Sequence, residues 1–303
     1  MFKVENIKKS FGDKEVLKNI NLSIQSGEVY GLVGANGAGK TTLFNIIAQI
    51  LKPDFGKVFV DDKQVQSAND LSQNIGYIID IPAMFEYMTA YEYLDFLMSP
   101  LKLNKQQVRE KSDYLLLAVG LKDVGNKRIK TFSRGMKQRM GIASGLVSNP
   151  KVILMDEPSS ALDPEGRIDV VNIIELLRKQ GKIILLSTHI LTDVERVCDR
   201  VGLLVKGNLI IEGKIDEVLK KYAKPILRVE TKKVDEVQKA IKRVRYIVKT
   251  TLINEGIDIE CKEGKQRDLF KRISELDIPF DGIFFKKPTI EEVFIEANKE
   301  VVK

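Results

Sequence analysis

The sequence is poor in the residues that build disulfide frameworks and metal clusters. Its 303 residues include only two cysteines, Cys198 and Cys261, which lie far apart and show no metal-like spacing. A disulfide framework is therefore not expected, and the low cysteine usage favours a reducing compartment. A chain of this length can bury a substantial core without covalent cross-links.

Long apolar runs are also missing. No window comes close to the roughly 18 consecutive apolar residues of a membrane-spanning helix, so we expect no such helix. The first residues, Met1–Asn6, lack the apolar core of a signal peptide, so we expect no signal peptide either.

Positive charge is in excess, but it is not concentrated. The net charge of +7 allows contacts with nucleic acid or with an anionic membrane surface. However, no block of about five or six like charges occurs, so a solvated basic surface is the simpler interpretation. Apolar residues form 44% and charged residues 30% of the chain, a balance typical of globular proteins.

The hydrophobic pattern predicts an α/β domain over residues 1–215. Alternating apolar and polar residues up to about residue 30 indicate an antiparallel β layer. Short apolar strands at 29–33, 152–155 and 183–187 alternate with helical segments, which indicates a mostly parallel core sheet covered on both faces. Helical spacing over about 84–145 predicts a helical subdomain within this region.

The composition changes after Lys214, and we expect a small accessory α+β domain over residues 216–303. Residues 220–225 are typical of a linker or turn. Beyond it, strands are predicted at 226–230, 246–252, 256–261 and 282–286, and helices at 234–244, 267–276 and 289–298.

A phosphate-binding motif follows the first apolar strand and opens a helix. Its residues match G-x-x-x-x-G-K-[ST] and are Gly34, Ala35, Asn36, Gly37, Ala38, Gly39, Lys40 and Thr41. A chance match occurs in about one chain in a hundred, but this strand and helix are the required context. Glycines allow backbone N–H groups to face phosphate oxygens. The motif predicts that Lys40 reaches the β- and γ-phosphates of ATP, that Thr41 ligates Mg²⁺ and that Thr42 faces the α-phosphate.

Two acids end the second apolar strand. Charges at the end of a buried strand are costly unless they are paired or bind a metal. We therefore predict that Asp156 holds Mg²⁺ and that Glu157 acts as the general base that activates water. An exposed turn is the alternative for Asp-Glu-Pro alone. His189, the single histidine, follows the third strand, and from that edge it could hydrogen-bond a γ-phosphate, although a lone histidine is more often structural.

The run Phe132–Arg139 resembles the signature of the ATP-binding cassette (ABC) family, usually Leu-Ser-Gly-Gly-Gln, and the resemblance covers residues 1 to about 215. It implies the P-loop NTPase fold. It also implies that Ser133 and Gly135, at a helix N-terminus, contact the γ-phosphate bound by an opposite protomer. Ser133 is equally suited to an ordinary helix cap, and the two roles are compatible.

Further segments strengthen this resemblance. Residues 160–163 resemble the D-loop that crosses the dimer interface, and residues 187–189 resemble the switch-histidine segment. Phe11 stands where the family places an aromatic ring that stacks on adenine, although a lone Phe in an amphipathic ribbon usually belongs to the core.

Two departures from the family pattern resemble the exporter branch that includes bacitracin- and lantibiotic-type exporters. Asp80 stands in place of the usual Gln, from where it could bind Mg²⁺ or a water molecule, and Arg134 and Met136 replace Gly and Gln in the signature. The tail 288–294 also resembles the C-terminal segment of that branch.

The resemblance implies an ATP-hydrolysing subunit with ATP and Mg²⁺ as cofactors. It would act as a homodimer or paired cassette on the cytoplasmic face of the membrane. A separate integral membrane permease would be contacted through 84–145, where residues 87–93 are rich in Tyr and Met. No nucleic acid is expected as a partner. The alternatives are a soluble cassette ATPase that acts on nucleic acid or ribosomes, and a non-hydrolysing regulatory module. The residues do not name a cargo.

Overall fold

The computed structural model describes residues 1–66, 70, 74–160, 162–222 and 224–302. These residues form two compact units. One comprises Met1–Ile215 and the C-terminal residues from Ala297 on, and the other comprises Asp216–Glu296. Among the described residues, no helix has both the length and the apolar content needed to cross a bilayer.

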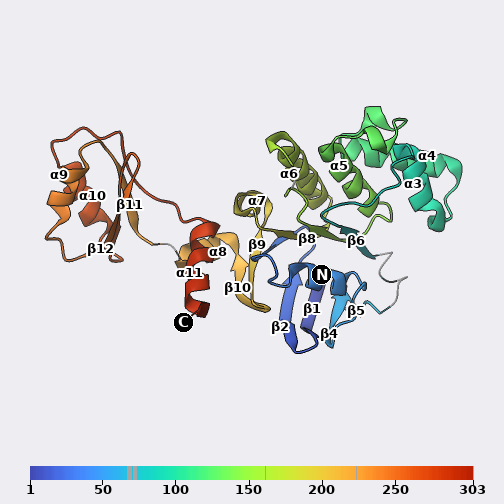
Figure 1. The fold of residues 1–303 in the computed structure, drawn as a ribbon, viewed down its shortest axis with the longest axis horizontal. Helices are drawn as coiled ribbons and strands as arrows, with labels where there is room; N and C mark the ends of the chain where they lie inside the picture. The colour runs from blue at the N-terminus through green and yellow to red at the C-terminus, as the bar shows by residue number, and fades with distance from the viewer. Residues whose placement is uncertain (67–69, 71–73, 161, 223, 303) are drawn as a thin grey trace. The chain divides into compact units, whose positions relative to one another are not determined.

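A six-stranded sheet forms the centre of the first unit (Figure 1). Its strands are β3 (Val29–Val33), β6 (Ile75–Ile78), β7 (Val152–Asp156), β8 (Ile183–Thr188), β9 (Arg200–Val205) and β10 (Asn208–Lys214). The order is β10-β9-β3-β8-β7-β6, and every neighbouring pair is parallel except β9 with β10. The predicted mostly parallel sheet is confirmed. Strands β3, β7 and β8 are buried at every position because both faces of the sheet are covered.

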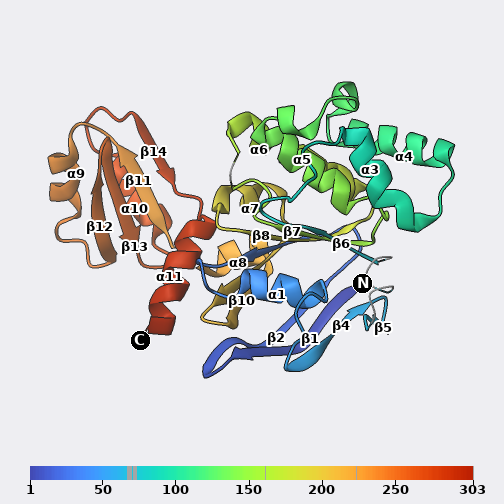
Figure 2. The same ribbon diagram turned by 45° about the vertical axis from the view of Figure 1, so that its right-hand side comes forward.

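One face packs against α1 (Lys40–Ile47) and a second, antiparallel sheet. This sheet has the order β2-β1-β4-β5 and consists of β1 (Phe2–Phe11), β2 (Lys14–Ile24), β4 (Phe55–Val60) and β5 (Lys63–Gln64). Figure 2 shows α1 between the two sheets. Apolar side chains of α1, such as Leu43 and Phe44, join those of both sheets in one buried cluster, so the predicted antiparallel layer is confirmed.

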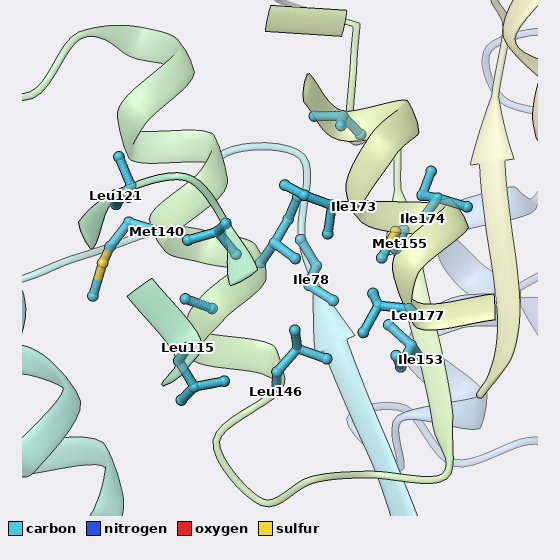
Figure 3. Close-up of a cluster of buried hydrophobic side chains, with 14 of the residues drawn as sticks. Ile78, Leu115, Leu121, Met140, Leu146, Ile153, Met155, Ile173, Ile174 and Leu177 are labelled. Atoms are coloured by element: carbon cyan, nitrogen blue, oxygen red, sulfur yellow. The ribbon is translucent and has the colours of Figure 1, made fainter. Parts of the chain in front are cut away.

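Helices cover the other face. They are α3 (Ala90–Met98), α4 (Lys105–Ala118), α5 (Arg134–Gly145), α6 (Pro164–Lys179) and α7 (Leu191–Val197), with short 3₁₀ turns at Ser99–Leu101, Lys122–Val124 and Ile129–Thr131. Capping boxes start α3 at Thr89 and α4 at Asn104. Figure 3 shows how Leu115, Met140 and Ile173 from these helices meet Ile78 and Ile153 of the sheet in a second buried cluster.

The second unit contains a small sheet, and two of its helices pack on it. Its elements are α8 (Ile215–Tyr222), β11 (Ile226–Glu230), α9 (Val234–Ile241), β12 (Ile247–Ile253), β13 (Gly256–Cys261), α10 (Gln266–Ser274) and β14 (Gly282–Phe285), followed by α11 (Ile290–Val302). The strand order β12-β13-β11-β14 and the β-α-β-β-α-β succession are those of a ferredoxin-like unit. Leu227, Val229 and Ile257 lie in its core with side chains of α9 and α10.

The predicted linker at 220–225 is wrong in its first half, because Lys220, Lys221 and Tyr222 belong to α8. Ile215 and Val218 are three residues apart on this helix and both are buried. Acids lie in the first turn and lysines in the last, where they complement the helix dipole. The cluster of lysines that suggested a linker is thus the C-terminal turn of an amphipathic helix.

We expect Leu154→Ala, in the centre of β7, to lower the free energy of unfolding by about 2–5 kcal/mol, because the side chain is fully buried and its removal leaves a cavity. Leu117→Ala on α4 is the matched control, since Leu117 is 60% exposed and should change stability by less than about 0.5 kcal/mol. Urea denaturation followed by circular dichroism measures both. Equal losses in the two variants would contradict the assigned burial.

Candidate functional site

A cleft of about 510 Å³ lies at the edge of the core sheet where the parallel strands end. The loop after β3 lines it from Ala35 to Thr42, together with Asp80 after β6 and Asp156 and Glu157 at the end of β7. Lys14 and Val16 of β2 complete the lining. Parallel strands place their carboxyl ends at one edge, so segments far apart in sequence meet in one cleft.

Glycine is required at two points of the phosphate loop. Gly39 has φ +112°, and a Cβ there would lie 2.8 Å from Cδ2 of Leu17. At Gly34 a Cβ would lie 2.6 Å from the carbonyl oxygen of Leu204. The loop can thus bend tightly over β2 and β9 and present its N–H groups at the start of α1.

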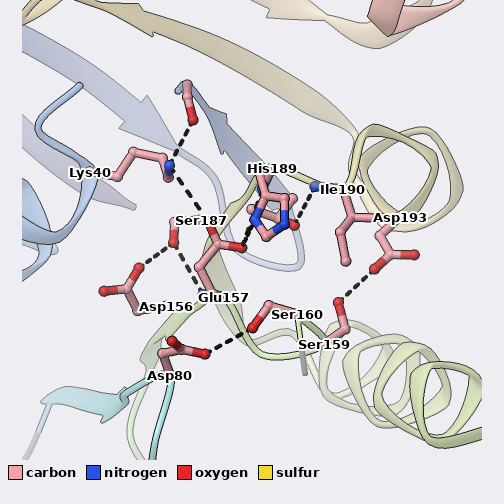
Figure 4. A network of polar contacts seen from close by, with 12 residues as sticks. Lys40, Asp80, Asp156, Glu157, Ser159, Ser160, Ser187, His189, Ile190 and Asp193 are labelled. Carbon is pink, nitrogen blue, oxygen red and sulfur yellow. Dashed lines mark hydrogen bonds and ion pairs between the residues drawn. The ribbon is translucent and has the colours of Figure 1, made fainter. Parts of the chain in front are cut away.

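Lys40 is buried, and its ammonium group lies between two oxygens. Its Nζ donates a hydrogen bond of 2.7 Å to the carbonyl oxygen of Gly34 and lies 3.6 Å from Oε1 of Glu157 (Figure 4). The ammonium is therefore held at the cleft wall beside an acid. A phosphate in the cleft would compete with Glu157 for this charge.

Asp156 is buried and is held by a residue to which the sequence gave no separate role. The hydroxyl of Ser187, in β8, donates a hydrogen bond to Oδ1 of Asp156 and accepts one of 3.2 Å from the backbone N–H of Glu157. Burial, followed by the charge of Asp156, raises the pKa of Tyr77 well above its usual range, so this phenol stays protonated at neutral pH. The sequence signal that could have identified Ser187 is its position as a polar residue near the end of an apolar strand.

Glu157 has a left-handed backbone, with φ +48°, which is uncommon for a non-glycine residue and is typical of functional sites. Its Oε2 lies 2.8 Å from Nδ1 of His189 and accepts a hydrogen bond of 3.3 Å from the His189 backbone N–H (Figure 4). The structure thus brings together Glu157, His189 and Lys40, the three residues that we predicted to be catalytic.

Asp80 lies in the same cleft and contacts the segment that resembles the D-loop. The hydroxyl of Ser160 donates a hydrogen bond of 2.9 Å to Oδ1 of Asp80. Ala161 of that segment lies outside the described residues, while Asp163 caps α6 by accepting a hydrogen bond of 2.9 Å from Gly166 N–H. Asp80, after β6, is therefore linked to the segment before α6 by one side-chain hydrogen bond.

Ser133 and Gly135 lie in a different hollow. Ser133 caps α5, since its hydroxyl accepts a hydrogen bond of 3.2 Å from the backbone N–H of Met136. A hollow of about 440 Å³ is lined by Ser133, Arg134 and Gly135 together with residues from 162 to 169, and it shares no lining residue with the phosphate-loop cleft. Within one chain, the signature residues therefore do not complete the nucleotide cleft.

Phe11 ends β1 and is half exposed, so it is not the core residue that an amphipathic ribbon usually holds. Its register partner across the ribbon is Lys14, which lines the cleft, and the Lys9 ammonium lies 5.5 Å from its ring centroid. Phe11 does not itself line the cleft. It lies beside Lys14, which lines the cleft together with Val16.

The cleft offers hard oxygen ligands rather than a complete metal cage. Within the part of the chain that the structure describes, no group of three or more His, Cys, Asp or Glu side chains is arranged to hold a metal. Thr41 and Asp156 nevertheless both line the cleft. Mg²⁺ is commonly held by one or two protein oxygens together with substrate phosphates, and this donor set fits it.

Residues 17–160 match the family model described as ABC transporter. The lantibiotic transport ATP-binding protein SrtF of Streptococcus pyogenes is 36% identical over 216 residues, which are 71% of this chain and 92% of SrtF. The daunorubicin resistance ATP-binding protein DrrA3 of Streptomyces coeruleorubidus is 28% identical over 303 residues and covers 97% of this chain and 95% of its own length.

Another relative, an uncharacterized ABC transporter ATP-binding protein of Synechocystis sp., is 38% identical over 207 residues. That match spans 68% of this chain and 58% of the Synechocystis protein. Among solved structures, the dimeric post-hydrolysis state of the ATP-binding cassette MJ0796 with ADP and Pi is similar, with a TM-score of 0.64 and 28% identity over 71% of this chain and 99% of that one.

We expect Lys40→Ala to weaken ATP binding by about tenfold or more and to abolish turnover, because a buried ammonium that faces the phosphates is lost. Lys52→Ala, which removes an exposed lysine beyond the end of α1, is the control and should leave both unchanged. Equilibrium binding of a fluorescent ATP analogue and phosphate release measure the two effects. Unchanged affinity in Lys40→Ala would contradict the assignment of the cleft.

Proposed function

This chain belongs to the ATP-binding subunits of ABC transporters and is an ATP hydrolase, and from that premise we propose that it powers a separate integral membrane permease. It works as an exporter subunit at the cytoplasmic face of the membrane. Two cassettes close on ATP and open after hydrolysis, and this motion is passed to the permease. The names of SrtF and DrrA3 refer to lantibiotic transport and daunorubicin resistance, and both support a role in an exporter.

The separation of two half-sites on one chain carries this proposal. The phosphate-loop cleft contains Lys40, Asp156 and Glu157, whereas the signature residues line a hollow of their own. A nucleotide in the cleft of one copy is completed only when Ser133 and Gly135 of a second cassette are brought over it. ATP then joins the two copies of a homodimer or paired cassette.

The start of α5 is suited to that contact. Ser133 and Arg134 are exposed, Gly135 is half-buried, and a Cβ at Gly135 would have only Leu162 Cδ2 within 4.0 Å. A phosphate can therefore approach the backbone closely at this point. The N-terminal end of a helix favours an anion through its free N–H groups and its dipole.

The contacts in the cleft assign the chemical roles. Glu157, the general base, accepts a proton from the attacking water, and His189 at 2.8 Å orients its carboxylate. Lys40 and the phosphate-loop N–H groups offset the charge that develops on the γ-phosphate. Thr41 and Asp156 would hold Mg²⁺, with Asp80 beside them, and the bound ion would neutralise phosphate charge. Phe11 lies next to the adenine end.

The surface that would contact the permease is an exposed aromatic cluster after β6. Phe85 lies 5.3 Å from Phe96 and 5.9 Å from Tyr87, measured between ring centroids. Tyr87 is 67% exposed and Ile81 is 73% exposed. Exposed aromatic groups of this kind mark interaction sites. Ile81 directly follows Asp80, and Phe85 and Tyr87 come soon after it. The docking surface is therefore close in sequence to a residue that lines the nucleotide cleft.

We expect Glu157→Gln to abolish turnover and to retain ATP binding, because the amide cannot accept the proton of the attacking water but fills the same space. The ATP-loaded variant should then accumulate as a dimer on size-exclusion chromatography. Glu110→Gln, on the exposed side of α4, is the control and should behave as the parent. A Glu157→Gln variant that binds ATP and remains monomeric would contradict the closing of two cassettes.

We expect Tyr87→Ala to reduce co-purification with the permease and transport at least about fivefold, because an exposed aromatic contact is removed. The ATPase activity of the isolated chain should remain. Leu117→Ala, an exposed apolar residue on α4, is the matched control. Equal transport by the two variants would contradict the assignment of the aromatic cluster as the docking surface.

A further inference from the structure

A second enclosed space lies in the first unit, between α4, the end of α5 and α6. Its volume is about 270 Å³, and it shares no lining residue with the nucleotide cleft. Its apolar walls come from Leu115 of α4, Leu146 after α5, and Ile173 and Leu177 of α6, which Figure 3 shows converging in the buried cluster. The volume is just below the range of about 300–1,000 Å³ of typical ligand pockets, so it suits a small molecule.

Two lysines line this cavity, and its lining contains no acid. They are Lys111 of α4 and Lys182, directly before β8. Among the described residues, Lys111 has no hydrogen-bond or ion-pair partner. Lys182 donates only to neutral oxygens, at 2.6 Å to Oδ1 of Asn149, 3.3 Å to its carbonyl and 2.8 Å to the carbonyl of Pro150. Two lysines therefore line one space that has no acid among its lining residues, and of the two only Lys111 has its donors free.

This arrangement costs free energy in the absence of an anion. Burial lowers the pKa of Lys111, and burial followed by the charge of Lys111 lowers the pKa of Lys182. A single lysine could lay its aliphatic stem along an apolar wall and keep its ammonium in water. Two like charges at one cavity, with that of Lys111 close enough to lower the pKa of Lys182, are not explained by that role.

The rim of the cavity is polar at one point and open beside it. Nε2 of Gln180, at the C-terminal end of α6, donates a hydrogen bond of 2.9 Å to the hydroxyl of Tyr114 on α4. Tyr114 and Leu176 also line the space and are both exposed, so the apolar wall continues to solvent. A small molecule can therefore enter between α4 and α6 without unfolding either helix.

We propose that this cavity binds a small organic monoanion of the class of medium-chain aliphatic monocarboxylates. The carboxylate would accept hydrogen bonds from Nζ of Lys111, whose donors are free, and Lys182 would add a second positive charge. The hydrocarbon body would lie against Leu115, Leu146 and Leu177. One free ammonium suits one negative charge, and the limited volume excludes a long chain or a bulky group.

Octanoate is the probe, and isothermal titration of the full-length chain is the measurement. We expect octanoate to bind and to raise the melting temperature, whereas acetate, which lacks the apolar body, and 1-octanol, which lacks the charge, bind at least about tenfold more weakly. Lys111→Gln should weaken octanoate binding about tenfold or more. Lys105→Gln, which removes an exposed charge at the start of the same helix, should bind as the parent does.

A second variant tests the space rather than the charge. Ala118→Phe places a ring at a residue that lines the cavity, and it should abolish octanoate binding while ATP binding is unchanged. No octanoate binding to the parent, equal binding by Lys111→Gln and Lys105→Gln, or binding of 1-octanol as tight as that of octanoate would each overturn the proposal. ATP hydrolysis by the same preparation shows whether the nucleotide site is intact, so failure of the two proposals can be told apart.

Discussion

The ends of the parallel strands β3, β6, β7 and β8 at one edge of the core sheet are the constraint on which the rest of the site depends. Strand β7 ends in Asp156, and the segments that follow β3 and β6 carry the phosphate loop and Asp80, so these polar residues meet in one cleft. Glu157 shows the result most clearly. Its left-handed backbone turns the carboxylate between Lys40, at 3.6 Å, and His189, at 2.8 Å. The carboxylate of Glu157 is thus paired with the ammonium of Lys40 within the cleft before any phosphate enters it.

The signature residues lie apart from the residues of this cleft. Lys40 and Glu157 face the phosphate loop, but the start of α5 with Ser133 opens into a separate hollow. Asp80 and Ser160 form a hydrogen bond between the nucleotide cleft and the segment that leads to α6, whose first residues line the signature hollow.

The cavity between α4 and α6 follows from a different part of the packing. Helices α4, α5 and α6 cover the same face of the sheet, and their apolar side chains fill most of the space between them. The packing leaves a space of about 270 Å³, and Lys111 and Lys182 are among the residues that line it. From the sequence alone, Lys111 would be assigned to the solvated face of a helix. It lines the proposed site only because of the residues that pack around it.

Much of the fold and the composition of the nucleotide cleft could be predicted from the sequence, because they depend on local patterns. Continuous apolar runs identified the buried strands, and the spacing of Gly34, Gly39 and Lys40 identified the phosphate loop. Lys220 and Lys221 misled the prediction, since charge at a helix end and charge in a linker look alike until Ile215 and Val218 are seen to be buried.

Only the tertiary structure placed Ser187 on Asp156, separated Ser133 from Lys40, and left Lys111 beside Lys182 without an acid. These are contacts between residues far apart in the chain, and they depend on side-chain direction and packing, which no local pattern encodes.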